Sequence, residues 1–142
     1  MPDTMSKKEQ DQSAAENVPD SKTESVIGYI QAIEKASMRW FDEVSKFEKM
    51  DSAYYWPLLT QIYRNDAKGR RTSLSDAEKF VPHLSASQVR RAITIAEEAG
   101  FVSLSDPHKR PRYVKLQPKA ASLIEDTAEF ALTEMSRFLS PD

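Results

Sequence analysis

The side chains best suited to a chemical task follow Ser85. Ser87, Gln88, Arg90 and Arg91 face outward on a helix that this serine is expected to begin. Serine and glutamine side chains hydrogen-bond to the edges of bases, glutamine favouring adenine, and arginine binds guanine or phosphate. This segment therefore predicts contacts with nucleic acid.

A second basic group lies further along the chain, in a turn-rich stretch that begins at Asp106. It carries Lys109, Arg110 and Arg112. On the tip of a hairpin, such side chains reach backbone phosphates or the minor groove of DNA. We expect this segment to add affinity to the contacts made by the helix.

The composition gives little support to catalysis. The chain has no cysteine and only two histidines, His83 and His108, so a cysteine nucleophile and thiolate or histidine-rich metal sites are excluded. Its three glycines form no phosphate-cradling loop. Acidic pairs such as Glu97 and Glu98 are adjacent in sequence, and adjacent residues do not face each other on a helix. The sequence predicts no enzyme, no metal and no cofactor.

The charges are distributed unevenly along the chain. The formal net charge is −2, but from Arg64 to Lys119 there are 12 lysines and arginines and 6 aspartates and glutamates. A basic middle between acidic flanks is typical of a surface that binds a polyanion. A merely solvated surface would scatter the two signs.

Length and composition limit the architecture. A chain of 142 residues suits one domain. Residues 1–22 are polar and nearly free of large apolar side chains, which predicts a disordered tail. No apolar run approaches the ~20 residues that span a membrane, and the N-terminus has no signal-peptide pattern. We therefore expect a cytoplasmic protein without a membrane partner.

Two long helices are expected within the domain, over residues 23–50 and 118–139. On the first, apolar side chains follow steps of four and three from Val26 to Phe47, which makes one stripe along a helix. A single small domain has trouble covering such stripes. The sequence therefore predicts a homodimer built from these two helices.

Between them, residues 57–117 predict a compact lobe. A helix begins near Pro57, a short helix is stopped by Pro82, and a third follows Ser85 with the capping-box partner Gln88. Strands over 101–105 and 112–116 then form a hairpin. The order predicts a mainly α, α+β domain over 23–142, a winged helix-turn-helix.

The segments LSASQVRRAITIAEEAGFV and DPHKRPRYVKLQP resemble the winged helix of MarR-type transcription regulators. The resemblance covers Thr72 to Gln117 in detail, and the long helices fit the dimerisation helices of that family. A two-fold dimer predicts a pseudo-palindromic operator in double-stranded DNA, with half-sites about one helical turn, roughly 34 Å, apart. The contacts that the resemblance implies are Ser87, Gln88, Arg90 and Arg91 on the recognition helix, and Arg110 on the wing with Lys109 and Arg112 beside it.

The chain departs from the family pattern at three places. His108 or Lys109 stands where the family has a second wing aspartate, which often orients the wing arginine. Ala96 replaces a leucine at the exit of the helix, and the turn between Val81 and Leu84 has no glycine. The sequence leaves the orientation of Arg110 open.

Four aromatic residues, Trp40, Tyr54, Tyr55 and Trp56, admit two interpretations. The resemblance implies a pocket for a small aromatic effector, whereas an aromatic cluster beside a helix start is also typical of a core. The function has an alternative too, because winged helices serve as protein–protein interaction modules without sequence-specific DNA binding. The basic helix and hairpin favour DNA.

Overall fold

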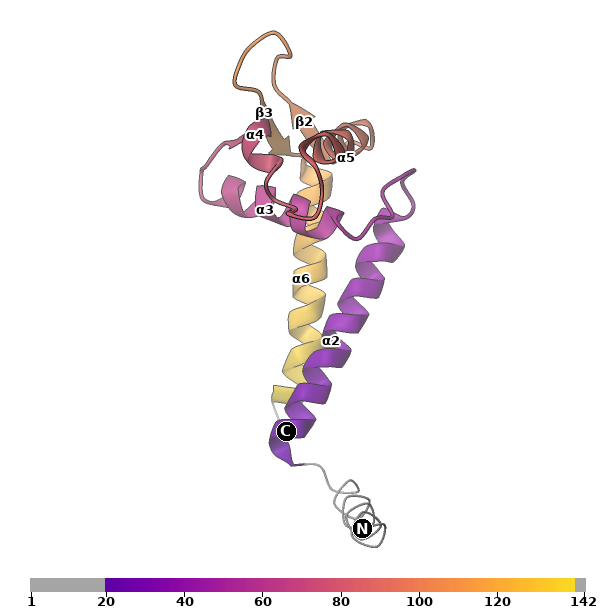
Figure 1. Ribbon diagram of the computed structural model, residues 1–142. Helices are drawn as coiled ribbons and strands as arrows, with labels where there is room; N and C mark the ends of the chain where they lie inside the picture. The colour runs from indigo at the N-terminus through magenta and orange to yellow at the C-terminus, as the bar shows by residue number, and fades with distance from the viewer. Residues whose placement is uncertain (1–19, 140–142) are drawn as a thin grey trace, which may run out of the picture.

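The computed structural model describes residues 20–139, which form a stalk of two long helices and a head of shorter helices and a sheet (Figure 1). In the stalk, α2 spans Ser21–Val44 and α6 spans Pro118–Leu139. The two helices run antiparallel, so the start of α2 and the end of α6 lie together far from the head (Figure 1). The protein is mostly helical with a small antiparallel sheet, which agrees with an α+β class.

The stalk begins at a capped helix end. The Asp20 side chain accepts a hydrogen bond of 2.7 Å from the Thr23 main-chain N–H, and this bond holds the pKa of Asp20 below its ordinary value. The prediction of a disordered tail over residues 1–22 is wrong at its end, because Ser21 and Lys22 are helical. Residues 1–19 of that tail lie outside the described part of the chain. The prediction that this helix continues to residue 50 is also wrong, because the chain turns after Val44.

The stalk helices meet through small side chains. The buried face of α2 recurs every four residues, at Gly28, Ala32 and Ala36, and then at Trp40 and Val44. The small side chains at the first three of these positions let the backbones of α2 and α6 approach each other closely. The apolar stripe predicted from the sequence lies largely on a different face, since Val26, Ile30 and Ile33 are 49%, 47% and 46% exposed.

A buried acid also ties α6 to α2. Glu134 accepts a hydrogen bond of 3.2 Å from Lys35 of α2 and lies 3.2 Å from Arg137 on its own helix. Two cations therefore offset the cost of burying this carboxylate. No helix in residues 20–139 is both long and apolar enough to cross a membrane.

The head contains α3, Tyr55–Ala67, α4, Leu74–Ala77, and α5, Ala86–Glu98. The side chain of Ser73 caps α4. Because α4 ends at Ala77, the prediction that Pro82 stops this helix is wrong. The Ser85–Gln88 capping box of α5 is confirmed. The apolar stripe of α5 faces the core, with Val89, Ala92, Ile93 and Ala96 all buried.

The sheet has three antiparallel strands in the order β1-β3-β2. The predicted hairpin corresponds to β2, Val102–Leu104, and β3, Tyr113–Leu116. The sequence did not predict β1, Thr72–Ser73, which pairs with Tyr113 and Val114. Gly100 adopts a φ of 80° between α5 and β2, a conformation that glycine takes readily. The sheet thus joins the segment before α4 to the hairpin after α5.

Candidate nucleic-acid interface

Helix α5 separates its apolar residues from its polar ones. Its apolar stripe packs into the core of the head, and the opposite face is open. All four side chains predicted as contacts on this helix are exposed: Ser87, Gln88, Arg90 and Arg91. The outer face of α5 is therefore free to approach a partner.

Gln88 is partly committed to the helix itself. Its Oε1 accepts a hydrogen bond of 2.8 Å from the Ser85 main-chain N–H, and its own N–H donates to Ser85 Oγ at 3.2 Å. A bidentate contact with adenine needs both ends of the glutamine amide. While the capping box is closed, Gln88 has only its amide NH₂ for a base, and Arg91 is the longest unengaged side chain near this helix start.

Arg90 is held by an acid that the sequence did not single out. Its Nε donates a hydrogen bond of 2.7 Å to Oε1 of Glu78, directly after α4. The side chain of Arg90 is 59% exposed and that of Glu78 is 18% exposed. The ion pair joins α5 to the end of α4 and leaves the two terminal nitrogens of Arg90 without a hydrogen bond to Glu78. Glu78 lies 12 positions from Arg90, so helical spacing gives no signal for this pair.

The hairpin loop orients Arg110 through its own backbone. Arg110 Nη1 donates to the carbonyl oxygens of Pro107, at 2.6 Å, and Lys109, at 3.2 Å. Asp106 accepts from the His108 N–H at 2.9 Å, which closes the turn. Main-chain carbonyls of the loop therefore orient Arg110, which settles the orientation that the sequence left open.

Arg112 differs from its neighbours because it is half-buried. Its Nη2 donates to the Ser105 carbonyl at 3.1 Å, which clamps the two sides of the hairpin. Its Nε is buried without a hydrogen-bond partner among the described residues. Lys109, by contrast, is exposed at the tip. The three basic side chains predicted on the hairpin therefore have three different environments.

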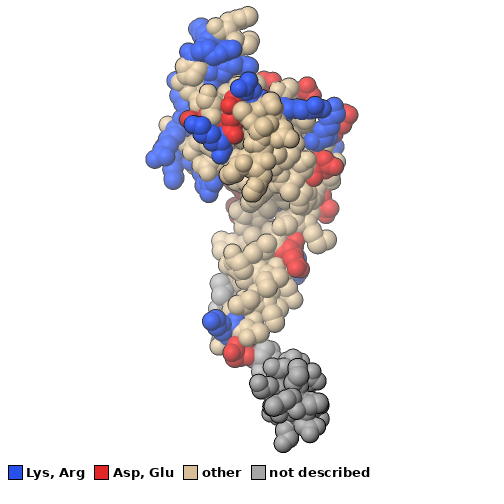
Figure 2. All heavy atoms as spheres, viewed as in Figure 1, with Lys and Arg blue, Asp and Glu red and all other residues tan. Residues whose placement is uncertain are grey.

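The head brings the two predicted groups together. Arg90 of α5 lines one cleft, of about 320 Å³, with Arg110 and Arg112 of the hairpin. Lysines and arginines gather over the head and the hairpin, whereas the visible face of the stalk carries few charges (Figure 2). The uneven charge of the sequence thus becomes a basic head on a stalk whose two helices carry more acidic than basic residues.

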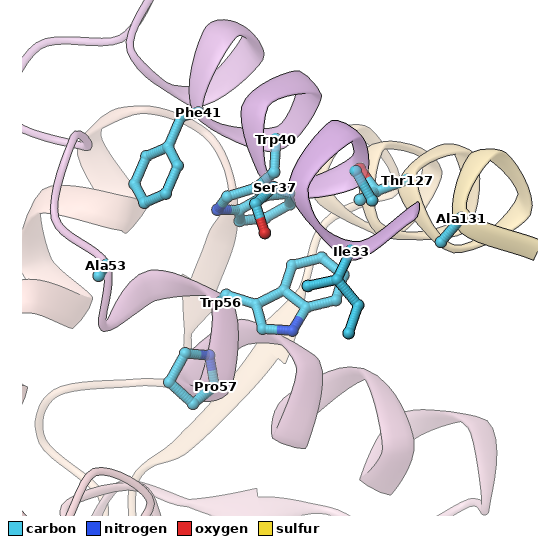
Figure 3. A pocket seen from close by; sticks show the side chains of 10 residues that line it. Ile33, Ser37, Trp40, Phe41, Ala53, Trp56, Pro57, Thr127 and Ala131 are labelled. Atoms are coloured by element: carbon cyan, nitrogen blue, oxygen red, sulfur yellow. The ribbon is translucent and has the colours of Figure 1, made fainter. Parts of the chain in front are cut away.

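The aromatic residues separate into two groups. Trp40 and Trp56 pack edge to face, with ring centroids 4.8 Å apart, and line a cavity of about 380 Å³ between α2, α3 and α6 (Figure 3). Trp40 is 2% exposed, and its indole N–H has no hydrogen-bond partner among residues 20–139. Tyr54 and Tyr55 do not line this cavity.

Tyr55 instead belongs to the core, as the second interpretation of the aromatic cluster allowed. It is fully buried, and its hydroxyl donates to the main-chain carbonyl of Ala92 in α5 at 3.0 Å. Burial raises the pKa of Tyr55 well above its ordinary value, so the hydroxyl keeps its proton as a donor. Tyr54 is half-buried against the ring of Tyr55.

No protein-family model matches the chain, and neither a curated protein nor a solved structure is significantly similar to it.

Proposed function

We propose that the protein is a sequence-specific DNA-binding transcription regulator that acts as a homodimer. In this proposal α4, the turn and α5 form a helix-turn-helix, and the hairpin of β2 and β3 is its wing. One observation carries the proposal: the open face of a capped helix and the hairpin that follows it present arginines to the same cleft. Such an arrangement suits a duplex, whose bases and phosphates lie within reach together.

The two elements have different tasks in this proposal. The start of α5 enters the major groove, where each base pair presents a distinct pattern of donors and acceptors. Arg91 and Ser87 read base edges there, and Gln88 contributes its free amide NH₂. Lys109 and Arg110 approach phosphates and the minor groove, which carries less sequence information.

The dimer is proposed from the exposed apolar surface of the stalk. Val26, Ile30, Ile33 and Phe41 lie along one side of α2, at steps of four, three and eight, and all are exposed. Large exposed apolar patches mark interaction sites. A second copy that covers this side would place two α5 helices in a symmetric pair.

An experiment with random-sequence duplexes tests the proposal. The full chain is incubated with a random DNA pool, and the bound fragments are recovered and sequenced. A recurring pseudo-palindromic sequence supports it. Retention without any recurring sequence, or no retention, contradicts it and favours the interaction-module alternative. A variant that replaces Arg90, Arg91 and Arg110 by alanine should retain no operator DNA, whereas partner binding by an interaction module would be unaffected.

A specific observation also favours a ligand in the Trp40–Trp56 cavity. Its lining is mainly apolar, yet the buried indole N–H of Trp40 lacks an acceptor among the residues described. A small aromatic acid or similar molecule would fill the space and, once a small shift of the Trp40 ring uncovers the indole N–H, accept this hydrogen bond. We propose this cavity, rather than the surroundings of Tyr54 and Tyr55, as the effector site.

A further inference from the structure

The cleft between α4, α5 and the base of the hairpin has a chemistry of its own. Arg90, Arg110 and Arg112 line it, and Glu78 is the one acidic side chain among the described residues of its lining. The hydroxyl-bearing Ser75 lies at the same cleft. The cleft therefore joins three guanidinium groups and a single carboxylate in one small concave surface.

The donors in this cleft match a phosphate group. Glu78 contacts Arg90 through Nε, so both terminal nitrogens of that guanidinium remain for another acceptor. Arg110 and Arg112 each use one terminal nitrogen on carbonyls of the hairpin loop. Guanidinium groups bind phosphate oxygens through paired N–H donors. A single phosphate between α5 and the hairpin would satisfy donors from both.

We propose that this cleft binds one phosphodiester phosphate of the DNA backbone, and that Glu78 weakens that binding by sharing Arg90 with it. The inference rests on the proposed DNA-binding function. It adds to that function a specific phosphate site and a residue, Glu78, that reduces the affinity of this site. A phosphate that contacts Arg90 must come near the Glu78 carboxylate, and like charges at that range repel. Glu78 therefore limits sequence-independent affinity and leaves discrimination to the start of α5.

Replacing Glu78 by glutamine tests the inference, because an amide oxygen can still accept from Arg90 Nε. Titrations of the full chain with a scrambled duplex, at several salt concentrations, measure affinity and its salt dependence. E78Q should bind this duplex about three- to tenfold more tightly than the unmodified protein, with a log–log salt slope steeper by about one for each additional phosphate that is neutralised. Glu98→Gln, which removes the same charge from an exposed position near the end of α5, is the matched control and should change affinity less than about twofold.

The outcomes separate the inference from the function on which it rests. If the unmodified protein binds no duplex at all, the proposed function fails. If it binds but E78Q has the same affinity for the scrambled duplex as E98Q, or a weaker one, the proposal that Glu78 weakens phosphate binding is overturned. In an Arg90→Ala background, E78Q should lose most of its effect, and a full effect there also overturns the proposal.

A second variant keeps the test valid if E78Q does not fold. Arg90→Gln changes an exposed side chain, so the fold is expected to survive. It should lower the affinity for operator and scrambled duplexes by the same factor. The log–log salt slope should fall by about one for each phosphate that Arg90 no longer neutralises. A loss of affinity confined to the operator would show that Arg90 reads bases, and would contradict a phosphate site.

Discussion

The hydroxyl of Tyr55 on α3 donates a hydrogen bond of 3.0 Å to the main-chain carbonyl of Ala92 at the centre of α5. Both residues are buried, so the bond is shielded from water. It fixes α5, which carries the proposed base contacts, against the helix that follows the stalk. The buried side of α5 is thus held by a directed contact as well as by apolar packing.

Tyr55→Phe should lower the free energy of unfolding by about 0.5–1.5 kcal/mol, because the variant loses one net hydrogen bond while the Ala92 carbonyl keeps its helical partner. Tyr55→Ala should lower the free energy of unfolding by about 3–5 kcal/mol, because it opens a cavity in the core. Urea unfolding followed by circular dichroism measures both. Tyr54→Phe, a half-buried neighbour, is the control with little change. Equal stabilities of Tyr55→Phe and the unmodified chain would contradict the role of this bond.

The sequence predicts the elements whose signals are local. The capping box of Ser85 and Gln88 fixes the start of α5, and Pro118 begins α6 as expected. The strand β1 was missed because two residues are too few to show alternation. The early end of α2 was missed because an apolar residue, Phe47, prolonged the helical pattern into a turn.

The site was harder to predict wherever the partner of a side chain is distant in sequence. Exposure of Ser87, Gln88, Arg90 and Arg91 follows from the helical period alone. The pairing of Arg90 with Glu78, and the clamp from Arg112 to Ser105, depend on how α4 and the hairpin fold back. Such contacts have no spacing rule, so the sequence could indicate only the residue types.

Asp20→Ala should lower Tm at neutral pH, because the first turn of α2 loses its side-chain acceptor. The pKa of Asp20 is lowered in the fold, so its carboxylate stabilises the protein above the ordinary aspartate pKa of 3.8 and stops doing so as the pH falls through the lower folded value. The Tm difference between the two proteins should therefore shrink in acid. Asp20→Asn, which retains an acceptor, is the control. A difference that is constant down to the most acidic pH would contradict the assignment.

The dimer predicts a mass of twice 16.2 kDa by sedimentation at micromolar concentration. Ile30→Asp should produce a folded monomer, because it places a charge on the exposed apolar side of α2 and leaves the face toward α6 unchanged. Gln31→Asp adds the same charge at an exposed position off this side and should remain dimeric. A monomeric unmodified chain, or equal masses for the two variants, would reject this interface.

The Trp40–Trp56 cavity predicts quenching or a shift of tryptophan fluorescence when small aromatic acids are added. Trp40→Phe should weaken binding about 10- to 150-fold, because a hydrogen bond to a ligand carboxylate contributes roughly 1.5–3 kcal/mol. Trp56→Phe retains an aromatic wall and is the control with a smaller effect. If Trp40→Phe binds every ligand that the unmodified protein binds with the same affinity, the indole N–H has no part in recognition.

Lys109→Ala should weaken binding to all duplexes alike, because its exposed ammonium at the hairpin tip is expected to contact phosphate alone. The log–log salt slope should fall by about one for each phosphate that the lysine no longer neutralises, and a symmetric dimer carries two copies of this lysine. Titrations of operator and scrambled DNA at three salt concentrations measure the slope. His108→Ala, on the same loop and without a formal charge at neutral pH, is the control. A change in the operator-to-scrambled ratio would assign base recognition to the hairpin.

The most direct test of DNA recognition by α5 is the ratio of operator to scrambled-duplex affinity in Arg91→Ala. Arg91 is exposed near the start of α5, so its replacement should leave folding and the stalk unchanged. Loss of a base contact should cost about 1–3 kcal/mol on the operator and relax base preference there, so the ratio should fall by about 5- to 150-fold for one such contact. A ratio identical to that of the unmodified protein would show that α5 does not read the sequence, and would contradict the proposed function at its centre.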